Sequence, residues 1–538
     1  MAQAPSVAIP SRLPLILQPE NRDASSERDA KLVDGYMEKG VREGETWIYK
    51  RPGLQRAELG VLELAGPGRG IYNWLGAVFV VVGTSMYRCD TFPVPIGGAV
   101  FLGTVDDNGH VYTFSTCLGD HPTLQMQNGR TAYNCDFLLG PAEISQVVQD
   151  LAISLIEGVT YTIASVGTTN FMLVGASANT VGTIFIASGP TPGNGIATRS
   201  NENFPVYPNL VPGWAYLDGT TYVMDRSAYI HGSTTLPGMN RPDVWEDLTN
   251  VIGAQIEPDR GVCLAKQLVY VVALKEWSTE VFYDAMNPPG ASPLSPVQGA
   301  KINYGCASAA SVQEIDGMLI WASTNRAASV QVLLLDNLKP TIISTKAVER
   351  LLIDADFSEV YSLGFKYEGH RFYVLTLRNS KLSLVYDLTD KMWSQWTDGV
   401  GGDFRGVSNT FFGVHRVVQD EAEGLFFLSG SYYTDYDHPI TVDLYTPNFD
   451  GGVRRRKHLN QMEFIADQTE GSVIQVRTND DDYEALKWSS FREVDLSVKR
   501  PLLVNCGTFY RRATHIRHAC DTPFRLQAIE LQLDIGTL

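Results

Sequence analysis

The residues best suited to hold a metal ion lie near the end of the sequence. Cys506, His515, His518 and Cys520 place two thiols and two imidazoles within fifteen residues, and zinc in proteins is commonly bound by these donors. Their spacing matches no common structural zinc motif. On a strand covering residues 511–519, the two histidines would point to opposite faces of the sheet. The sequence therefore predicts structural side chains here, with no metal and no cofactor.

An acidic run, Thr478–Glu484, has the charge of a calcium-binding loop but not its pattern. It lacks the glycine at the sixth position and a suitably placed final glutamate. It lies between the strand-like Val473–Arg477 and the apolar Leu486–Trp488. The run is therefore expected to be a solvated hairpin turn.

Motifs of the common enzyme classes are missing from the sequence. It contains no G-x-x-x-x-G-K-[ST], G-x-S-x-G or H-E-x-x-H motif and no S-x-D-x-G-x-T-W box. No catalytic residue can be named, so we expect a protein that is not an enzyme. Because a glycosidase needs only two carboxylates at a defined separation, a carbohydrate-binding or carbohydrate-cleaving propeller stays open as the alternative.

The charge distribution limits the possible partners. The formal net charge is −17, whereas residues 446–538 contain equal numbers of basic and acidic residues. Proteins that wrap nucleic acid through its phosphates carry the opposite sign, so we do not expect sequence-independent DNA wrapping. The main basic cluster is a candidate interface for phosphates or an acidic partner, or a set of strand-face charges paired with carboxylates. It consists of Arg454, Arg455, Arg456, Arg511, Arg512 and Arg517.

Compartment signals are few. The seven cysteines form no C-x-x-C pair, which predicts free thiols in a reducing cell. The first residues do not form a signal peptide, and no apolar run approaches the roughly 20 residues that cross a bilayer. We expect no membrane-spanning segment and synthesis in the cytoplasm.

The elements that must position these residues are short strands rich in Val, Tyr and Phe. Taking the residue just before each apolar run as a marker, five of the six intervals are near 50 residues. Such a period with several strands is typical of β-propeller blades. The sequence predicts an all-β chain with a β-propeller of six to eight blades, and an evenly spaced series of β-sandwich hairpins remains the alternative. The markers are Gly76, Gly129, Gly219, Gln267, Gly317, Gly369 and Gly424.

Additions to the propeller are also expected. The N-terminal arm has a helix-like piece, Ser25–Glu38, and a strand-like piece, Trp47–Lys50. The long second interval between markers indicates an insert. In this insert, Ala142–Glu157 has apolar residues at helical spacing, and the uncharged Gly158–Ala197 divides into four short strands. The expected divisions are an N-terminal docking arm (1–56), the first part of the propeller (57–141), an inserted small β module (142–200), the second part of the propeller (201–445) and a C-terminal β domain (446–538).

Several collinear stretches resemble the tail hub, or nozzle, proteins of short-tailed (podovirus-type) bacteriophages, also called packaged-DNA stabilisation proteins. The insert is similar to a mobile module found across phage structural proteins. The stretches are Leu13–Leu54, Trp277–Asp284, Gly305–Ala307, Glu368–Trp396, and the closing segments F-Y-R-R-A-T-H-I-R and L-Q-L-D-I-G.

The resemblance implies a structural, non-enzymatic β-propeller subunit of a homohexameric tube. The tube would lie below the portal and its head-to-tail adaptor ring, carry tail fibre, spike or needle proteins, retain packaged DNA, and conduct double-stranded DNA without sequence specificity during ejection. The implied location is the virion tail, assembled in the host cytoplasm. The arm would become ordered only against the adaptor or neighbouring subunits. Its candidate docking residues are Tyr49, Lys50, Arg51, Pro52, Gly53 and Leu54.

Overall fold

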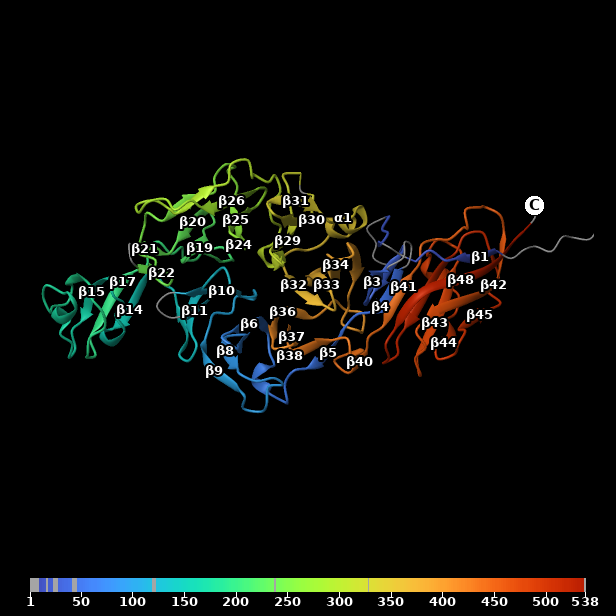
Figure 1. Ribbon diagram of the computed structural model, residues 1–538, viewed down its shortest axis with the longest axis horizontal. Helices are drawn as coiled ribbons and strands as arrows, with labels where there is room; N and C mark the ends of the chain where they lie inside the picture. The colour runs from blue at the N-terminus through green and yellow to red at the C-terminus, as the bar shows by residue number, and fades with distance from the viewer. Residues whose placement is uncertain are drawn as a thin grey trace, which may run out of the picture.

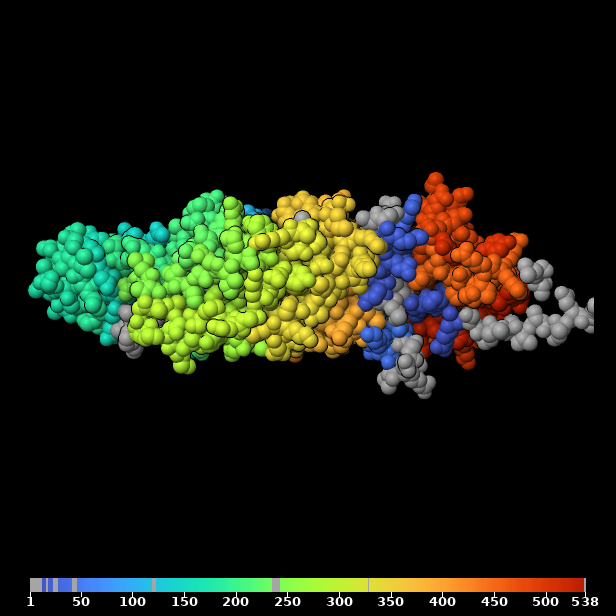
Figure 2. Space-filling model, turned by 90° about the horizontal axis from the view of Figure 1, so that it is seen from above, coloured from blue at the N-terminus to red at the C-terminus, as the bar shows by residue number. Residues whose placement is uncertain are grey.

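The computed structural model describes residues 9–15, 18–22, 28–40, 46–118, 122–236, 239–327 and 329–536. These residues form strands and short turns, with a single α-helix, α1 (Lys346–Ile353). The molecule is elongated: a ring of small sheets lies between a compact sheet at one end and the C-terminal sheets at the other (Figures 1 and 2). No helix among the described residues is long and apolar enough to span a membrane. The expected all-β fold class is confirmed.

The ring is a β-propeller of seven four-stranded antiparallel blades, counted over the described residues. Blade 1 consists of β6 (Gly68–Trp74), β7 (Ala77–Val82), β8 (Ser85–Cys89) and β9 (Ala99–Thr104), and blade 2 of β10 (Thr113–Leu118), β11 (Pro122–Gln127), β12 (Ala132–Asp136) and β13 (Gly140–Glu143). Blade 3 consists of β18 (Ala215–Leu217), β19 (Thr220–Met224), β20 (Tyr229–Gly232) and β23 (Val251–Gly253), and blade 4 of β24 (Gly261–Gln267), β25 (Tyr270–Lys275), β26 (Thr279–Asp284) and β27 (Leu294–Pro296).

The remaining three blades complete the circle. Blade 5 consists of β28 (Gln313–Ile315), β29 (Met318–Ser323), β30 (Gln331–Asp336) and β31 (Lys339–Ile342). Blade 6 consists of β32 (Val360–Tyr367), β33 (His370–Leu377), β34 (Leu382–Asp387) and β35 (Met392–Gln395). Blade 7 consists of β36 (Gly406–Phe412), β37 (His415–Asp420), β38 (Leu425–Ser429) and β5 (Gly53–Arg56).

The glycine repeat of the sequence comes from the turn between the first two strands of a blade. Leu75–Gly76, Asp218–Gly219, Asp316–Gly317 and Glu368–Gly369 have positive φ at both residues and join directly paired strand ends. These are two-residue hairpins of the kind that matches the twist of antiparallel strands. Two markers belong to a different turn, because Gly129 and Gly424 each lie between the second and third strands of a blade.

Every pair of adjacent blades shares its own buried apolar cluster. The cluster between blades 4 and 5 contains Trp321 and Leu274, and the cluster that closes the circle between blades 7 and 1 contains Val417 and Val80. Similar clusters fill the other five interfaces. A single blade cannot bury both faces of its sheet, so the ring folds only when all seven blades are packed.

The ring is closed by a strand from the N-terminal arm. β5 pairs antiparallel with β38, placing Gly53 opposite Ser429 and Leu54 opposite Leu428. β39 (Thr434–Asp435) continues this sheet beside β5 and pairs with β40 (His438–Pro439). Blade 7 therefore joins the beginning of the chain to the end of the propeller.

The inserted sheet lies between blades 2 and 3, at one end of the molecule (Figure 1). Its strand order is β14 (Val147–Leu151), β17 (Ile196–Ser200), β15 (Thr160–Ser165), β16 (Ile184–Ile186), with 3₁₀ turns at η2 (Ala152–Ser154) and η3 (Phe171–Val174). The helix-like spacing of Ala142–Glu157 is misleading, since β14 lies in this stretch and pairs along its length with β17. Gly158–Ala197 holds two complete strands and the start of a third rather than four.

The opposite end consists of two sheets around one core that includes Ile48, Leu444, Ile516 and Leu526. Four of the described arm strands belong to these sheets. In one sheet, β1 (Ile9–Arg12) and β4 (Thr46–Lys50) pair with β48, and β3 (Gly35–Lys39) pairs with β4 at the edge. In the other sheet, β2 (Lys31–Val33) lies between β35 of blade 6 and β41. The other strands are β41 (Val442–Tyr445), β42 (Lys457–Ala466), β43 (Val473–Asn479), β44 (Arg492–Asp495), β45 (Leu502–Val504), β46 (Thr508–Phe509), β47 (Ala513–His518) and β48 (Arg525–Ile535).

Two expectations about the arm are therefore wrong. The described part of Ser25–Glu38 forms strands instead of a helix, because its backbone groups pair with β35, β41 and β4. The described strands β2 to β5 also pair with strands of their own chain, so for this part of the arm the expectation of order only against another subunit or the adaptor is wrong.

Candidate functional site

A cluster of buried charges lies at the junction where the arm meets blades 6 and 7. Its centre is Arg51, whose side chain is completely buried. The Arg51 Nε donates to Asp34 Oδ1 at 2.6 Å, and its terminal nitrogens donate to the Asp435 carboxylate and to the carbonyl oxygens of Pro52 and Thr397. One guanidinium thus holds together the arm, the end of blade 6 and the strand beside β5.

The electrostatics of this cluster favour the ionised pair. Burial alone would lower the pKa of Arg51, but the Asp435 and Asp34 carboxylates more than offset it and the pKa is raised. Burial raises the pKa of Asp435, and Arg51 opposes that rise. Asp435 Oδ1 also accepts the backbone N–H of Leu54 at 3.0 Å, so the same carboxylate positions the closing strand β5.

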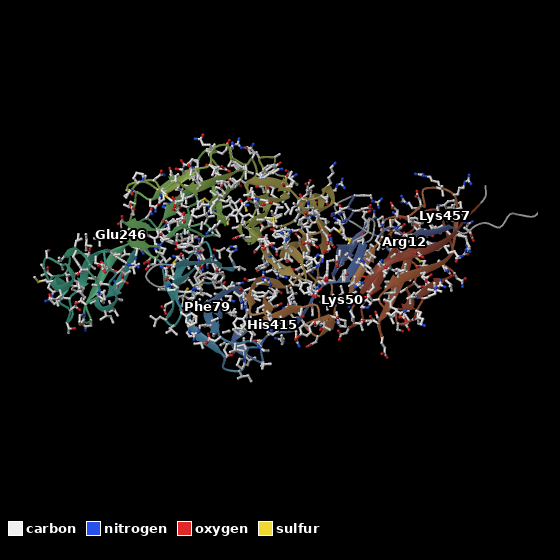
Figure 3. The ribbon with its side chains drawn as sticks, in the orientation of Figure 1. Arg12, Lys50, Phe79, Glu246, His415 and Lys457 are labelled. Carbon is white, nitrogen blue, oxygen red and sulfur yellow. The ribbon has the colours of Figure 1, made fainter. Side chains whose placement is uncertain are left out.

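The other residues predicted to dock on an adaptor or neighbouring subunit also make contacts within their own chain. Lys50 donates from Nζ to the carbonyl of Cys520 at 2.7 Å, and burial lowers its pKa to about 8 (Figure 3). Leu54 packs in the cluster between blades 6 and 7. Gly53 allows a close approach, because a Cβ there would lie 2.6 Å from the Thr434 carbonyl oxygen. Pro52 is buried as well, and only Tyr49 is half-exposed.

These contacts assign the segment from Tyr49 to Leu54 an intramolecular role that sequence reasoning missed. The one local signal is R-P-G directly after a strand, which by itself indicates only a turn. Docking of the same segment to an adaptor or neighbour stays a prediction.

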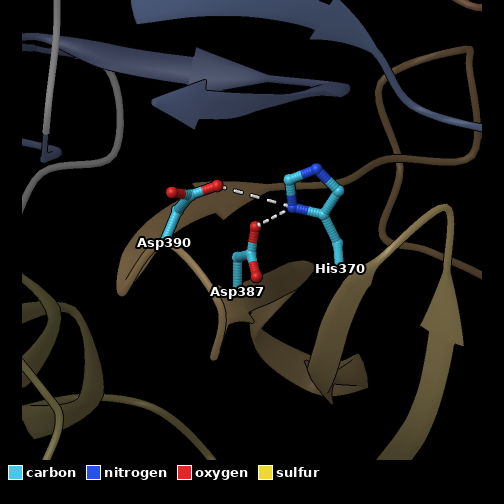
Figure 4. A group of neighbouring side chains, drawn as sticks. All are labelled: His370, Asp387 and Asp390. Atoms are coloured by element: carbon cyan, nitrogen blue, oxygen red, sulfur yellow. Dashed lines mark hydrogen bonds and ion pairs between the residues drawn. The ribbon is translucent and has the colours of Figure 1, made fainter. Parts of the chain in front are cut away.

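A second contact between the arm and the propeller is centred on His370, at the start of β33 (Figure 4). Its Nδ1 lies 2.6 Å from Asp387 Oδ2 and 3.6 Å from Asp390 Oδ2, and the ring of Tyr36 from β3 packs edge-on against the imidazole at 5.0 Å. Burial lowers the pKa of His370, but Asp387, Asp390 and Glu38 raise it by more, so the net shift is upward.

The His370 group is the one cluster within the described ranges whose ligand atoms, all within 4.8 Å of one another, could surround a metal ion. The short hydrogen bond to Asp387, whose other oxygen accepts the Thr389 N–H at 2.8 Å, already explains the geometry. We therefore interpret the cluster as a charge-assisted hydrogen bond that fixes the corner of blade 6 under the arm.

The basic cluster of the C-terminal sheets divides into two parts. Arg512 binds Asp480 in a bidentate ion pair at 2.7 and 2.8 Å. Arg517 pairs with Asp443 at 2.8 Å and Arg511 with Asp482 at 2.7 Å. These three arginines are therefore charges paired with nearby carboxylates, which was the second interpretation of the cluster. Two of the carboxylates belong to the acidic run 478–484.

The other three arginines, Arg454, Arg455 and Arg456, are exposed in the segment before β42. Arg456 donates to Thr508 Oγ1 at 2.9 Å. This segment keeps the accessible positive charge that an acidic partner surface would need, and its role as an interface stays a prediction.

The sulfur and imidazole groups considered for zinc are held apart. The strand considered for residues 511–519 corresponds to β47 (Ala513–His518). His515 Nε2 lies 2.6 Å from Asp443 Oδ1, and His518 Nε2 lies 2.9 Å from Ser472 Oγ. Burial lowers the pKa of His518 to about 3, so it is neutral in the folded protein at ordinary pH.

The centre of the propeller contains a cavity of about 820 Å³. It is lined by the first strands of several blades, with Arg69, His110 and Asn409 among its polar residues, and Glu359 is the one carboxylate among the described lining residues. Glycoside hydrolysis requires two carboxylates beside the bond that is cleaved. The cavity therefore lacks the arrangement that the carbohydrate-cleaving alternative needs.

Comparison with known proteins gives one family. The family model described as bacteriophage P22 Gp10, β-propeller, matches residues 215–428, which run from the first strand of blade 3 into β38 of blade 7. No curated protein matches the sequence.

Solved structures show only distant similarity. BamB from Moraxella catarrhalis has a TM-score of 0.34 at 10% identity, covering 78% of this chain and 98% of that chain. The extracellular domain of the putative one component system BT4673 from B. thetaiotaomicron has a TM-score of 0.37 at 9% identity, covering 88% of this chain and 58% of that chain. The computationally designed Ika8 protein has a TM-score of 0.33 at 10% identity, covering 70% and 98%.

Proposed function

We propose that this chain is a phage tail nozzle protein and a wall subunit of a hexameric tube. Its residues 215–428 match the family model described as bacteriophage P22 Gp10, β-propeller. The tube lies in the virion tail below the portal and adaptor, retains the packaged DNA, and conducts it during ejection. The chain is not an enzyme in this proposal. The family match over five of the seven blades is the observation that carries it.

The elongated shape of the subunit suits a tube made of several copies (Figures 1 and 2). In this proposal the channel for DNA lies on the axis between six elongated subunits and not in the centre of a single propeller.

The shape and charge of the chain fit the same role. Its two ends differ, with the inserted sheet at one and the arm and C-terminal sheets at the other (Figure 2). We assign the C-terminal end, with the exposed Arg454–Arg456 segment, to the adaptor and the inserted end to tail fibre, spike or needle proteins. With a net charge of −17, the subunit offers few phosphate contacts that would slow passing DNA.

The domain division follows from this assignment. The arm (1–56) and residues 446–538 form the attachment end, residues 57–141 and 201–445 form the propeller wall, and residues 142–200 form a separate module. The arm has two roles here, since it closes the propeller and anchors the attachment end.

DNA retention is tested with phage particles assembled with and without this protein. We expect heads that lack it to lose their DNA, measured as nuclease-sensitive DNA released after packaging. Adding the purified protein back should restore protection. Heads that keep full nuclease protection in its absence would contradict the proposed role.

A further inference from the structure

The inserted sheet exposes one complete face without a charged residue. The strand register places ten side chains on this outer face: Val147, Gln149 and Leu151 of β14; Ile196, Thr198 and Ser200 of β17; Thr160 and Thr162 of β15; and Ile184 and Ile186 of β16. The intervening residues Tyr161, Ile163, Phe185 and Ala197 point the other way and form the core of the module.

The largest side chains of the outer face are well exposed. Exposed fractions are 61% for Val147, 48% for Leu151, 68% for Ile184 and 63% for Ile186. The valine and leucine lie on one edge strand and the two isoleucines on the other, with the half-buried Ile196 and threonine and serine side chains between them. The outer face therefore has two exposed apolar edges and an uncharged polar centre. Exposed apolar groups gathered on one face are a feature of interaction sites.

The chemistry of the outer face excludes several partners. It has no Lys or Arg to bind phosphate groups, which excludes nucleic acid. It has no aromatic ring on which a base or sugar could stack. It has no charge to pair with an acidic or basic protein surface. What remains is a partner that contributes apolar and uncharged polar groups.

A second copy of this chain meets that requirement. Two chains of net charge −17 repel each other, so contacts between copies are favoured where the surface is free of charge. We infer that the outer face of the inserted sheet is a contact between neighbouring subunits. The inference rests on the proposed tube, in which each subunit has two neighbours.

The area of the face fits one part of such a contact. Four strands spaced about 4.8 Å apart, each with about five residues of about 3.3 Å, cover about 300 Å². A stable interface needs about 800 Å² on each partner. The outer face therefore supplies the contact at the inserted end, and the propeller walls supply the rest along the length of the subunit.

The test is the association of the full-length protein measured by sedimentation velocity over a range of concentrations. Ile184→Lys and Ile186→Lys place an unpaired charge in the contact, and Thr162→Glu does so without removing an apolar group. We expect each to weaken association by about 100-fold or more. Leu486→Lys, at a 91% exposed position in the C-terminal region, is the matched control and should associate like the unmodified protein.

Each outcome has a defined meaning. Circular dichroism establishes that the variants are folded, and the high exposure of Ile184 and Ile186 makes unfolding of their variants an unexpected result. A ring that forms equally well from all variants would overturn this inference while leaving the proposed tube intact. Smaller oligomers that are lost in the variants would support the outer face as a contact but contradict a six-membered ring. An unmodified protein that stays monomeric at all concentrations would overturn both.

Discussion

The N-terminal arm and the inserted sheet are segments of similar length that both lie outside the glycine repeat, yet they relate to the propeller in opposite ways. The arm contributes strands to blade 7 and to both C-terminal sheets. The inserted sheet pairs only with itself, and its first and last strands are neighbours, with Val147 opposite Ser200. The arm is part of the scaffold, whereas the insert is an addition that begins and ends at one point.

The charges follow the same division. The arm is fixed by buried ions such as Arg51, Asp34 and Asp435, whose hydrogen bonds define one geometry. The insert displays a face without charge. Buried ion pairs set the internal register of the chain, and an uncharged surface is left for contacts with other molecules.

Removing residues 1–56 should have a larger effect than any single substitution in the chain. The deletion takes the fourth strand from blade 7 and four strands from the C-terminal sheets, so the ring can no longer close. We expect loss of the cooperative thermal transition, measured by scanning calorimetry. A truncated chain that melts like the full-length protein would show that the arm is an accessory instead.

Substituting Arg51→Ala should destabilise the chain by about 3–5 kcal/mol, because it leaves two buried carboxylates without their counter-ion. The measurement is the shift of the urea-unfolding midpoint. Arg12→Ala is the control: the side chains of Arg12 and its partner Glu530 are 59% and 39% exposed, so the loss of this arginine should cost at most about 1 kcal/mol. Equal shifts for the two variants would argue against a central role for the buried cluster.

The His370 contact predicts a smaller, pH-dependent effect. Because its pKa is raised in the folded protein, its stabilising contribution is complete below the unfolded pKa of about 6.5 and is lost as pH rises through the folded value. The His370→Gln variant should therefore be less stable than the unmodified protein at pH 5.5, with a smaller difference at pH 8.5. Melting temperatures at both pH values measure this.

The exposed His110 provides a control for the pH experiment. His110→Gln should leave the pH profile unchanged. A profile for His370→Gln that runs parallel to that of the unmodified protein would contradict the assigned ion pair with Asp387.

Excising residues 147–200 should have the smallest effect on the stability of the propeller. Paired residues at the two ends have Cα atoms about 5 Å apart, so a short Gly-Ser link can replace the insert without strain. The excision mainly removes the packing of Val244 against the core of the module and the hydrogen bond from Thr160 N–H to Glu246. We expect a melting temperature within a few degrees of the unmodified value; a collapse of the transition would show that the insert is part of the scaffold.

The repeat is visible in the sequence because it has a local cause. A hairpin such as Asp316–Gly317 requires positive φ, and the same turn carries a glycine in blades 1, 3, 5 and 6. The marker at Gly424 follows a different turn, since the corresponding turn of blade 7 carries Gly413 between β36 and β37. Local turn chemistry thus predicts the class of fold, while the count of seven blades requires the strand pairing.

The errors in the arm and at the junction have a nonlocal cause. Lys31–Val33 becomes a strand because it lies between β35 and β41, more than 350 residues away along the chain. Arg51 appears in the sequence as a turn residue, and only the fold brings Asp34 and Asp435 to its two sides. Strand pairing and buried ion pairs between distant segments leave no periodic signal in the sequence.

The most direct test of the account is cryo-electron microscopy of the purified protein and of the tail that contains it. We predict a ring of six elongated subunits around an axial channel at least about 20 Å wide, the diameter of duplex DNA, with the propellers in the wall. A ring of another symmetry, or a closed assembly without an axial channel, would contradict the central claim.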